Sequence, residues 1–423
     1  MTASDGSVAD MHVLLVSNRF EARGGGTEVF THDLAHALLK RSIQVSWLAV
    51  DEGSMRSPLD GVRRIALSTP LGNAYPRDWR RREARQARHI ELLLTGLPTI
   101  DAIHVTHFSR IGLDFLECSA LKRVPASCTL TDYAAVCADY QLRHRPTGRL
   151  CHATAPSARC VSCLAHHAGE SESGEEGAAP GSQSVEEIDS WRRRNLSWLA
   201  ERCAAVWVQT PYQRQELISA GLDPAKLVRD IAAYAVPEPW YPLKPEVGDP
   251  QKALFLGRAS SEKGLHILLA AFRSWGGAGR LRLITLPDDL AYEQRLRGLA
   301  AEDPRVEWLA PMTRNQLGSV LAEARALIVP SQWYENHPLV IHYALALGVP
   351  VVCSALPSLR HLSALGDVQY VSPYDDLSAW TAALTQLFGT PPAPRRNRSE
   401  EFARGFEDLV DEIVAVYRAH RVA

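Results

Sequence analysis

The stretch Val329-Pro-Ser-Gln-Trp-Tyr-Glu-Asn-His-Pro-Leu-Val-Ile-His-Tyr-Ala-Leu-Ala-Leu-Gly-Val-Pro-Val-Val352 is the most informative part of the sequence. It predicts a strand that ends at Val329, a polar loop that carries Glu335 and Asn336, and a helix that Pro338 opens, because proline is tolerated in a first helical turn. Gly348 then closes the helix and residues 349–352 form the next buried strand. The pattern places an acid beside the free N–H groups of a helix start, although a strand-helix-strand unit with an ordinary polar loop has the same pattern.

The same alternation of strand-like and helix-like segments continues on both sides of this stretch, as is typical of βαβ units and parallel sheets. The strands expected in the first half are residues 11–17, 44–50, 102–106, 127–131 and 205–209. The alternation restarts with strand 253–257, helix 264–273, strands 281–286 and 305–309, helix 314–323 and strand 326–329. A chain of 423 residues suits two such cores.

The composition between these segments predicts the domain boundaries. Residues 236–250 hold five prolines and predict a linker between an N-terminal domain, 11–235, and a second domain, 251–397, which a terminal helix over 398–423 follows. Residues 137–167 form a cysteine-rich insertion in the first domain, and the acidic residues 168–186 predict a mobile loop.

The overall composition is that of an ordinary globular protein, with 46% hydrophobic residues and a net charge of −2. That charge provides no general attraction for nucleic acid, which we therefore do not expect as a partner. The first ten residues are polar and acidic, and no segment approaches the ~20 apolar residues of a membrane-spanning helix. We expect a cytoplasmic protein, whose eight cysteines favour thiols or metal ligation over disulfides.

Two glycine-rich loops follow expected strands, at residues 24–28 and 257–264. Each brings backbone N–H groups to a helix start, where an anion binds well, although such turns are also common as purely structural features. Neither loop has the spacing of a dinucleotide-binding or Walker motif. In the second loop, Arg258 and Lys263 can flank a pyrophosphate.

These motifs, taken together, resemble glycosyltransferase family 4, which comprises retaining enzymes of the GT-B fold. Four segments match the family in order along nearly the whole chain: Gly25-Gly-Thr-Glu28, the run 257–264, Pro304-Arg-Val306, and the run 330–340. The resemblance implies an α/β protein of two Rossmann-like domains that face each other across a donor-binding cleft. The family's final helix, which crosses back to the first domain, matches Ser399–His420.

The resemblance also implies roles for individual residues. Arg258 and Lys263 would bind the donor diphosphate, and Glu335 would lie beside the transferred sugar. Gly25 and Gly26 would approach phosphate or sugar from the opposite domain. The phosphate would be lined by the main chain of Asn336, His337, Pro338 and Leu339, in which every residue except the proline offers an N–H group. Glu28, His107 and Asp132 are the candidates on the sugar or acceptor side. The co-substrate is a nucleotide sugar, and the acceptor is a glycan, a lipid-linked molecule or a small molecule.

Three positions depart from the family pattern. Tyr343 stands where a second Glu normally holds the ribose hydroxyls, so either the donor is a deoxyribose dTDP-sugar or Tyr343 itself bonds an ordinary ribose. Thr131 stands where relatives carry a His before Asp132. Residues 286–289 replace a Gly-x-Gly, which alters the expected base pocket.

Catalysis in this family relies on cations that stabilise the departing diphosphate, and the sequence has no D-x-D motif, so we expect no catalytic divalent metal. A separate structural metal is predicted at Cys137, Cys151, Cys160 and Cys163, whose spacing and Cys-x-x-Cys pair suit tetrahedral zinc. An iron–sulfur cluster, nearby histidines as substitute ligands, or free thiols remain alternatives.

Residues 77–88 hold six arginines and two acids and are followed by Ile90 to Leu94. Such a helix can lie on anionic lipid, which would suit a lipid-linked acceptor at the inner membrane face, or can be an ordinary solvated surface. Two other functions fit the same motifs. They are a nucleotide-sugar epimerase of this fold and a catalytically inactive homologue that serves as a scaffold.

Overall fold

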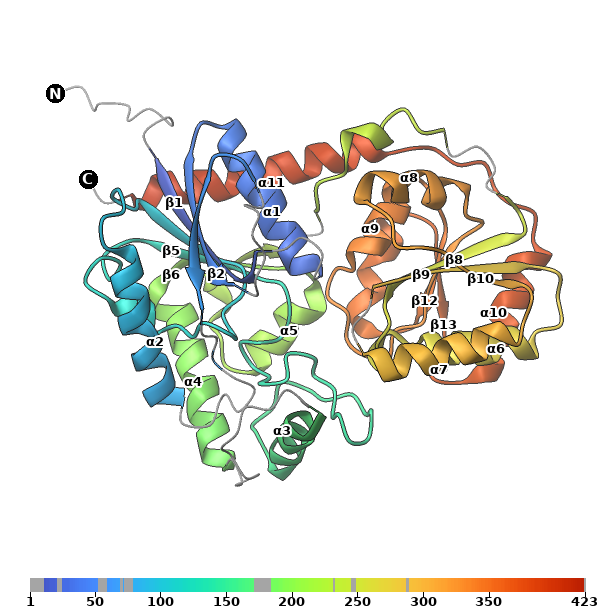
Figure 1. Ribbon diagram of the computed structural model, residues 1–423, viewed down its shortest axis with the longest axis horizontal. Helices are drawn as coiled ribbons and strands as arrows, with labels where there is room; N and C mark the ends of the chain where they lie inside the picture. Colours follow the sequence, from blue (N-terminus) through green and yellow to red (C-terminus); the bar gives the residue numbers. More distant parts are fainter. Residues whose placement is uncertain are drawn as a thin grey trace. The chain divides into compact units, whose positions relative to one another are not determined.

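The computed structural model describes residues 11–20, 25–51, 59–68, 71, 79–170, 184–230, 233–244, 249–286 and 289–421. The chain divides into two compact units, each with its own parallel sheet (Figure 1). We call them the N-terminal unit, Met1–Ile231 with Glu407–Ala423, and the C-terminal unit, Ala232–Phe406. The expected acidic loop lies largely outside the described residues, at 171–183.

The N-terminal unit is built on a seven-stranded sheet with the order β3-β2-β1-β4-β5-β6-β7. Its strands are β1 His12–Arg19, β2 Gln44–Val50, β3 Val62–Leu67, β4 Ala102–Val105, β5 Ala126–Leu130, β6 Cys203–Val208 and β7 Leu227–Asp230. All pairings are parallel, and the central strands are buried on both faces, as their continuous apolar sequences require. Its helices are α1 Gly26–Lys40, α2 Trp79–Leu94, α3 Ala158–Glu170, α4 Val185–Arg202 and α5 Pro211–Ser219, with short 3-10 turns η2 Asp114–Glu117 and η3 Pro224–Lys226.

The C-terminal unit repeats this arrangement with the order β10-β9-β8-β11-β12-β13. Its strands are β8 Lys252–Arg258, β9 Arg280–Leu286, β10 Val306–Trp308, β11 Leu327–Val329, β12 Val351–Ser354 and β13 Val368–Val371. Its helices are α6 Leu265–Ser274, α7 Leu290–Ala301, α8 Arg314–Glu323, α9 Leu339–Ala346 and α10 Leu377–Gly389, with 3-10 segments η4 Glu238–Trp240, η5 Ser261–Lys263 and η6 Pro357–Ala364. Because every strand is parallel, the loops after β8, β11 and β12 emerge at one edge of the sheet.

The last helix, α11 Ser399–His420, contributes its first residues to the C-terminal unit and the rest, from Glu407, to the N-terminal unit. In the N-terminal unit, Arg41 pairs with Glu407 at 2.8 Å and Asp411 at 2.7 Å. Deeper in the core, the hydroxyl of Tyr417 lies 2.7 Å from His104 Nδ1, and His104 Nε2 lies 2.8 Å from Thr129 Oγ1. These bonds fix the end of the helix on the sheet.

The predicted α/β fold class is confirmed, and helix 314–323 has the predicted bounds. The expected linker differs in one respect, because residues Glu238–Trp240 form a 3-10 turn that buries Trp240 in spite of the neighbouring prolines. Among the described residues, no helix has both the length and the apolar character needed to cross a bilayer.

Acidification is expected to destabilise the N-terminal unit through His104. Burial lowers the pKa of His104 to about 3, whereas an unfolded histidine titrates near 6.5. Below pH 6.5 the unfolded chain therefore binds a proton that the folded chain rejects, and stability falls as the pH falls. At pH 5 this amounts to about 2 kcal/mol. Urea unfolding at pH 7 and pH 5 should show a smaller loss for His104→Gln than for the unmodified protein, and an equal loss would contradict this assignment.

Candidate functional site

The loop after β8 and the loop after β11 are held together by a close approach of their main chains. Gly264 has φ +70°, and a Cβ added to it would lie 1.8 Å from the carbonyl oxygen of Pro330. The main-chain N–H of Gln332 also donates to the main-chain carbonyl oxygen of Glu262 at 2.7 Å. Only glycine allows this conformation and this contact at once, so the sequence at Gly264 determines where the two loops meet.

Two ion pairs occupy the loops that meet there. Lys263 Nζ lies 2.6 Å from Glu335 Oε1, which also accepts from the Ser331 hydroxyl at 2.7 Å. Arg258 Nη2 lies 2.8 Å from Glu262 Oε1. The structure therefore places the three predicted catalytic side chains, Arg258, Lys263 and Glu335, on adjoining loops of the C-terminal unit.

The two acids of these pairs are buried, with Glu335 4% exposed and Glu262 6% exposed. Burial alone would raise the pKa of Glu262, but the Arg258 guanidinium and a 2.6 Å hydrogen bond from the Ser260 hydroxyl lower it below the ordinary value. Glu262 therefore stays ionised and orients Arg258. The sequence predicts no role for Glu262, although it lies within the loop 257–264. Its position four residues after Arg258 is the feature that could have indicated an ion pair.

His337 takes part in a buried chain of imidazoles. Its Nδ1 lies 3.1 Å from His361 Nε2, its Nε2 lies 3.0 Å from His342 Nδ1, and His342 Nε2 lies 3.1 Å from the Tyr234 carbonyl oxygen. Burial lowers the pKa of His337 well below its ordinary value and that of His342 to about 3, so both rings are neutral. The imidazole of His337 therefore stabilises the loop and α9, which leaves only its amide for the predicted phosphate contact.

The remaining donor-side residues lie at the start of α9. Pro338 is the residue that precedes the helix, and Leu339 is its first residue. Tyr343 is buried, with its ring 4.8 Å from that of Trp240 and the Arg314 guanidinium 5.2 Å from its centroid. Tyr343 is thus part of the packing between α8, α9 and η4, and its predicted ribose contact stays a prediction.

In the N-terminal unit, the predicted sugar-side residues lie at the carboxyl ends of β4 and β5 and at the start of α1. His107 Nε2 lies 2.5 Å from Asp132 Oδ2. Burial alone would lower the pKa of His107, but the carboxylates of Asp132 and Glu28 raise it above the ordinary value. Burial raises the pKa of Glu28 as well.

The start of α1 is fixed to the neighbouring strand. Gly25 precedes the helix, which begins at Gly26, and the Thr27 hydroxyl donates to Thr131 Oγ1 at 2.7 Å. Thr131, which replaces the expected histidine, therefore positions the glycine-rich loop. The histidine that contacts Asp132 is instead His107, which follows the adjacent strand β4.

The predicted metal site at Cys137, Cys151, Cys160 and Cys163 is not supported. In the described part of the chain, no group of three or more His, Cys, Asp or Glu side chains is arranged to hold a metal ion, and all eight cysteines are free thiols. The Cys163 thiol donates to the Arg143 carbonyl oxygen at 3.7 Å, and burial raises its pKa to about 11. Burial likewise raises the pKa of Cys137 and Cys151, and the Cys151 thiol donates to the Arg149 carbonyl oxygen at 3.9 Å.

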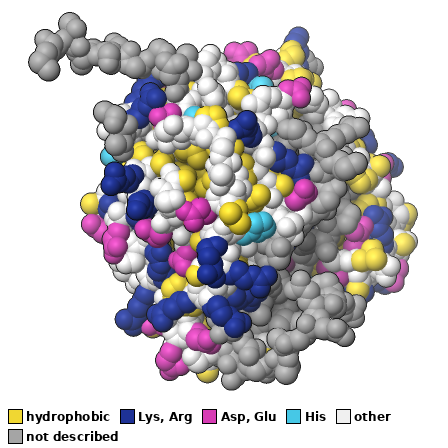
Figure 2. Space-filling model, turned by 60° about the vertical axis from the view of Figure 1, so that its left-hand side comes forward, with side chains coloured by type: hydrophobic (Ala, Val, Ile, Leu, Met, Phe, Trp, Pro, Cys, Tyr) yellow, Lys and Arg dark blue, Asp and Glu magenta, His cyan; other side chains and the backbone are white. Residues whose placement is uncertain are grey.

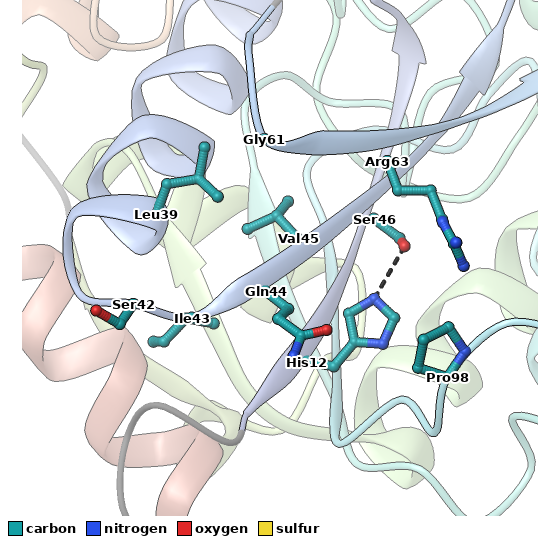
Figure 3. Close-up of a pocket in the computed structure, with 10 residues that line it drawn as sticks. All are labelled: His12, Leu39, Ser42, Ile43, Gln44, Val45, Ser46, Gly61, Arg63 and Pro98. Atoms are coloured by element: carbon teal, nitrogen blue, oxygen red, sulfur yellow. Dashed lines mark hydrogen bonds between the residues drawn. The ribbon is translucent and has the colours of Figure 1, made fainter.

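A pocket of about 370 Å³ lies elsewhere in the N-terminal unit, at the amino ends of β1 and β2 (Figure 3). His12 faces it, but its Nε2 bonds the Ser46 hydroxyl at 2.9 Å and its Nδ1 bonds the Thr99 carbonyl oxygen at 3.1 Å. Both ring nitrogens are thus engaged. The pocket is at the opposite end of the strands from His107 and Asp132, and we assign it no function.

Comparison with known proteins supports the glycosyltransferase group 1 family. Residues 250–390 match the family model "Glycosyl transferases group 1". D-inositol 3-phosphate glycosyltransferase from Mycolicibacterium smegmatis is 30% identical over 166 residues, which cover 39% of this chain and 36% of the relative. O-antigen chain mannosyltransferase B from Escherichia coli is 29% identical over 141 residues, which cover 32% of this chain and 36% of the relative. The match thus spans about a third of each relative.

Solved structures show the fold of the whole chain. Sucrose-phosphate synthase from Thermosynechococcus elongatus has a TM-score of 0.65 at 18% identity and covers 97% of this chain and 98% of its own. HepE from Anabaena, solved in complex with UDP and glucose, has a TM-score of 0.59 at 14% identity and covers 96% of this chain and 98% of its own. The chain therefore has the GT-B fold.

Replacing Gly264 by alanine should destabilise the C-terminal unit by at least about 2 kcal/mol, because the new Cβ would strain a left-handed residue and displace Pro330. The matched control is Gly298→Ala in the last turn of α7, where an added Cβ meets nothing within 4 Å. That change should stabilise the helix by about 0.5–1 kcal/mol. Thermal unfolding of both variants measures the difference, and equal effects would refute the close-approach argument.

Proposed function

We propose that this protein is a retaining glycosyltransferase of family 4, which transfers a sugar from a nucleoside-diphosphate sugar to an acceptor hydroxyl. The main support is the Lys263–Glu335 ion pair, which joins the loops after β8 and β11 and sets a cation and a buried acid side by side. The glycosyltransferase names of the family model and of both curated relatives favour the same activity.

In the proposed reaction, the bond between the anomeric carbon and the diphosphate oxygen breaks, and the electron pair stays on the diphosphate. The acceptor hydroxyl oxygen bonds the anomeric carbon from the same face, and its proton passes to the departing phosphate. Arg258 and Lys263 would stabilise the charge that develops on the leaving group, where fixed cations have their largest effect. The Glu335 carboxylate would accept a hydrogen bond from a hydroxyl group of the transferred sugar.

The N-terminal unit, taken by itself, carries groups suited to a hydroxylated ligand. Gly25 and Gly26 at the start of α1 would present amides to phosphate or sugar. The raised pKa of His107 favours the imidazolium form, which Asp132 holds in place, and Glu28 lies near enough to influence it. We assign these three side chains to the sugar or acceptor side.

Two observations favour different nucleotides for the donor. HepE was solved with UDP and with UDP-glucose, which makes a uridine donor one candidate. The absence of a carboxylate at Tyr343 makes a dTDP-sugar another. Both belong in a binding screen together with guanosine and adenosine donors.

We also propose that helix α2 of the N-terminal unit rests on an anionic lipid surface, which suits a lipid-linked acceptor. Glu83, the acid within its arginine-rich part, turns inward and accepts the amides of Leu113 and Asp114 at 2.7 and 3.2 Å. Arg80, Arg81, Arg85 and Arg88 are exposed on this helix together with Ala84, and its other acid, Glu91, accepts hydrogen bonds from Ser119.

Near the end of the same helix, the large apolar side chain of Leu92 is 74% exposed. Figure 2 shows Lys and Arg side chains gathered on one face of the molecule. A row of guanidinium groups that ends in an exposed leucine has the two features by which an interfacial helix binds lipid, charge attraction and apolar insertion.

Arg258→Ala and Lys263→Ala should each weaken binding of the donor nucleotide by about tenfold or more, because each removes a charged hydrogen bond to phosphate. Calorimetric titration with UDP, GDP, ADP and dTDP measures the effect. The control is Lys252→Ala, at the other end of β8, where Lys252 pairs with Asp249 at 2.7 Å.

If the unmodified protein binds none of the four nucleotides, the scaffold alternative is favoured. If the control weakens binding as much as the two site variants, the proposed diphosphate contacts are wrong. A separate incubation with a nucleotide sugar and no acceptor tests the epimerase alternative, which release of an isomerised sugar would favour.

The double charge reversal Arg85→Glu/Arg88→Glu should reduce binding to vesicles that contain anionic lipid by about tenfold or more, since each basic residue near such a surface contributes about 1 kcal/mol. Flotation with phosphatidylcholine vesicles, with and without phosphatidylglycerol, measures binding at low and high salt. Arg280→Glu/Arg404→Glu, in exposed positions of the C-terminal unit, is the control. Equal binding to neutral and anionic vesicles would rule out the charge mechanism.

A further inference from the structure

Two buried polar side chains in the loop between β11 and α9 have no hydrogen-bond partner among the described residues. Asn336 is 5% exposed, and both its carboxamide oxygen and its nitrogen are unpaired. Trp333 is 8% exposed, and its indole N–H is unpaired. Because both ends of the carboxamide are unpaired, exchanging its oxygen and nitrogen would not change this result.

The neighbouring polar groups of the same loop are all paired, which makes these two exceptional. Ser331 and Lys263 both bond Glu335, and the imidazole of His337 bonds two other histidines. Leaving a buried donor or acceptor without a partner costs about 1–3 kcal/mol. An unpaired group that persists in a buried loop therefore calls for a ligand or an ordered water.

The end of the adjacent strand β12 and the segment η6 that follows it also contain buried polar groups without partners. β11 and β12 are paired with Val329 opposite Cys353, so the segments that follow them emerge side by side. The hydroxyls of Ser354 and Ser358 are fully buried and also lack partners among the residues described. As whole residues both serines are 0% exposed, whereas Trp333 and Asn336 retain a small exposed fraction, so we assign the two serines to an ordered water.

The contact between Trp333 and Lys263 determines how the indole can be used. Lys263 Nζ lies over the face of the Trp333 ring, 5.1 Å from its centroid. The indole N–H lies in the plane of the ring, so the cation does not use it. The ring is thereby held by the ion-pair network and keeps one donor for a further acceptor.

We propose that the Trp333 indole N–H and the Asn336 carboxamide bind the hydroxyl groups of the transferred sugar, next to the diphosphate contacts. A carboxamide both donates and accepts, as a hydroxyl does, whereas a diphosphate only accepts and would be repelled by the carboxamide oxygen. The pair therefore recognises an uncharged polyhydroxylated group. This inference rests on the proposed glycosyltransferase activity and adds to it the residues that select the sugar.

The test compares each nucleotide with its sugar form. Trp333→Phe removes the N–H and keeps the ring, and Asn336→Leu removes both polar atoms at similar volume, with Asn336→Ala as a second variant if leucine prevents folding. Calorimetry is done with UDP and UDP-glucose, GDP and GDP-mannose, ADP and ADP-glucose, and dTDP and dTDP-glucose. Each variant should lose about tenfold in affinity for the sugar form of the preferred pair while its affinity for the free nucleotide changes less than twofold.

Two controls separate a binding role from a structural one. Trp198→Phe removes another unpaired, buried indole N–H, in α4 of the N-terminal unit, and should leave both affinities unchanged. The melting temperatures of the ligand-free Trp333 and Asn336 variants should not fall, because no hydrogen bond within the described protein is lost.

The outcomes distinguish this inference from the proposal on which it rests. Nucleotide binding with an unchanged preference for the sugar form would overturn the role of Trp333 and Asn336 alone. A wild-type protein that binds no nucleotide in the panel would overturn the glycosyltransferase proposal, and the sugar site with it. A loss equal for nucleotide and nucleotide sugar would show that the two residues act on the diphosphate or on the loop.

Discussion

The arrangement of the C-terminal unit depends on the contact between Gly264 and the carbonyl of Pro330. A residue with a side chain could not take φ +70° at this distance from a main-chain oxygen, so the loop after β8 could not reach the loop after β11. Once the two loops meet, Lys263 comes within 2.6 Å of Glu335, a residue 72 positions further along the chain. The charged site is therefore a consequence of a backbone contact that involves no charge.

The pairing of both cations with acids limits how the site can bind an anion. Arg258 with Glu262 and Lys263 with Glu335 sum to no net charge, so a diphosphate gains less from Coulomb attraction than it would from two unpaired cations. The acids instead keep the cations ordered before a ligand arrives, which lowers the cost of reorganisation. Such a site would bind most strongly the species with the most charge on its phosphates, and in the proposed glycosyl transfer that species is the departing diphosphate.

Much of the fold could be predicted because its signals are local. Apolar runs, loop glycines and proline positions lie within a few residues of the features they determine, and helix 314–323 was placed correctly on that basis. The chain of His361, His337 and His342 could not be predicted, since its members meet only after η6 folds beside α9. The cysteine spacing did predict that the thiols lie near one another, since Cys163 influences the pKa of Cys137 and Cys160 that of Cys151. The spacing could not show whether the thiols are arranged to hold a metal ion, because that depends on how the turns between them fold.

The loop of residues 331–337 contains polar groups of two kinds, and their difference has a physical meaning. The imidazole of His337 and the hydroxyl of Ser331 are buried and fully paired, and they stabilise the loop whether or not a ligand is bound. Trp333 and Asn336 are equally buried and unpaired, so they reduce the stability of the free protein. That cost is offset where such a group bonds an ordered water, as for Ser354 and Ser358, or a ligand, as we propose for Trp333 and Asn336. Within this loop, the unpaired groups rather than the paired ones are therefore the candidates for the proposed contact with the sugar.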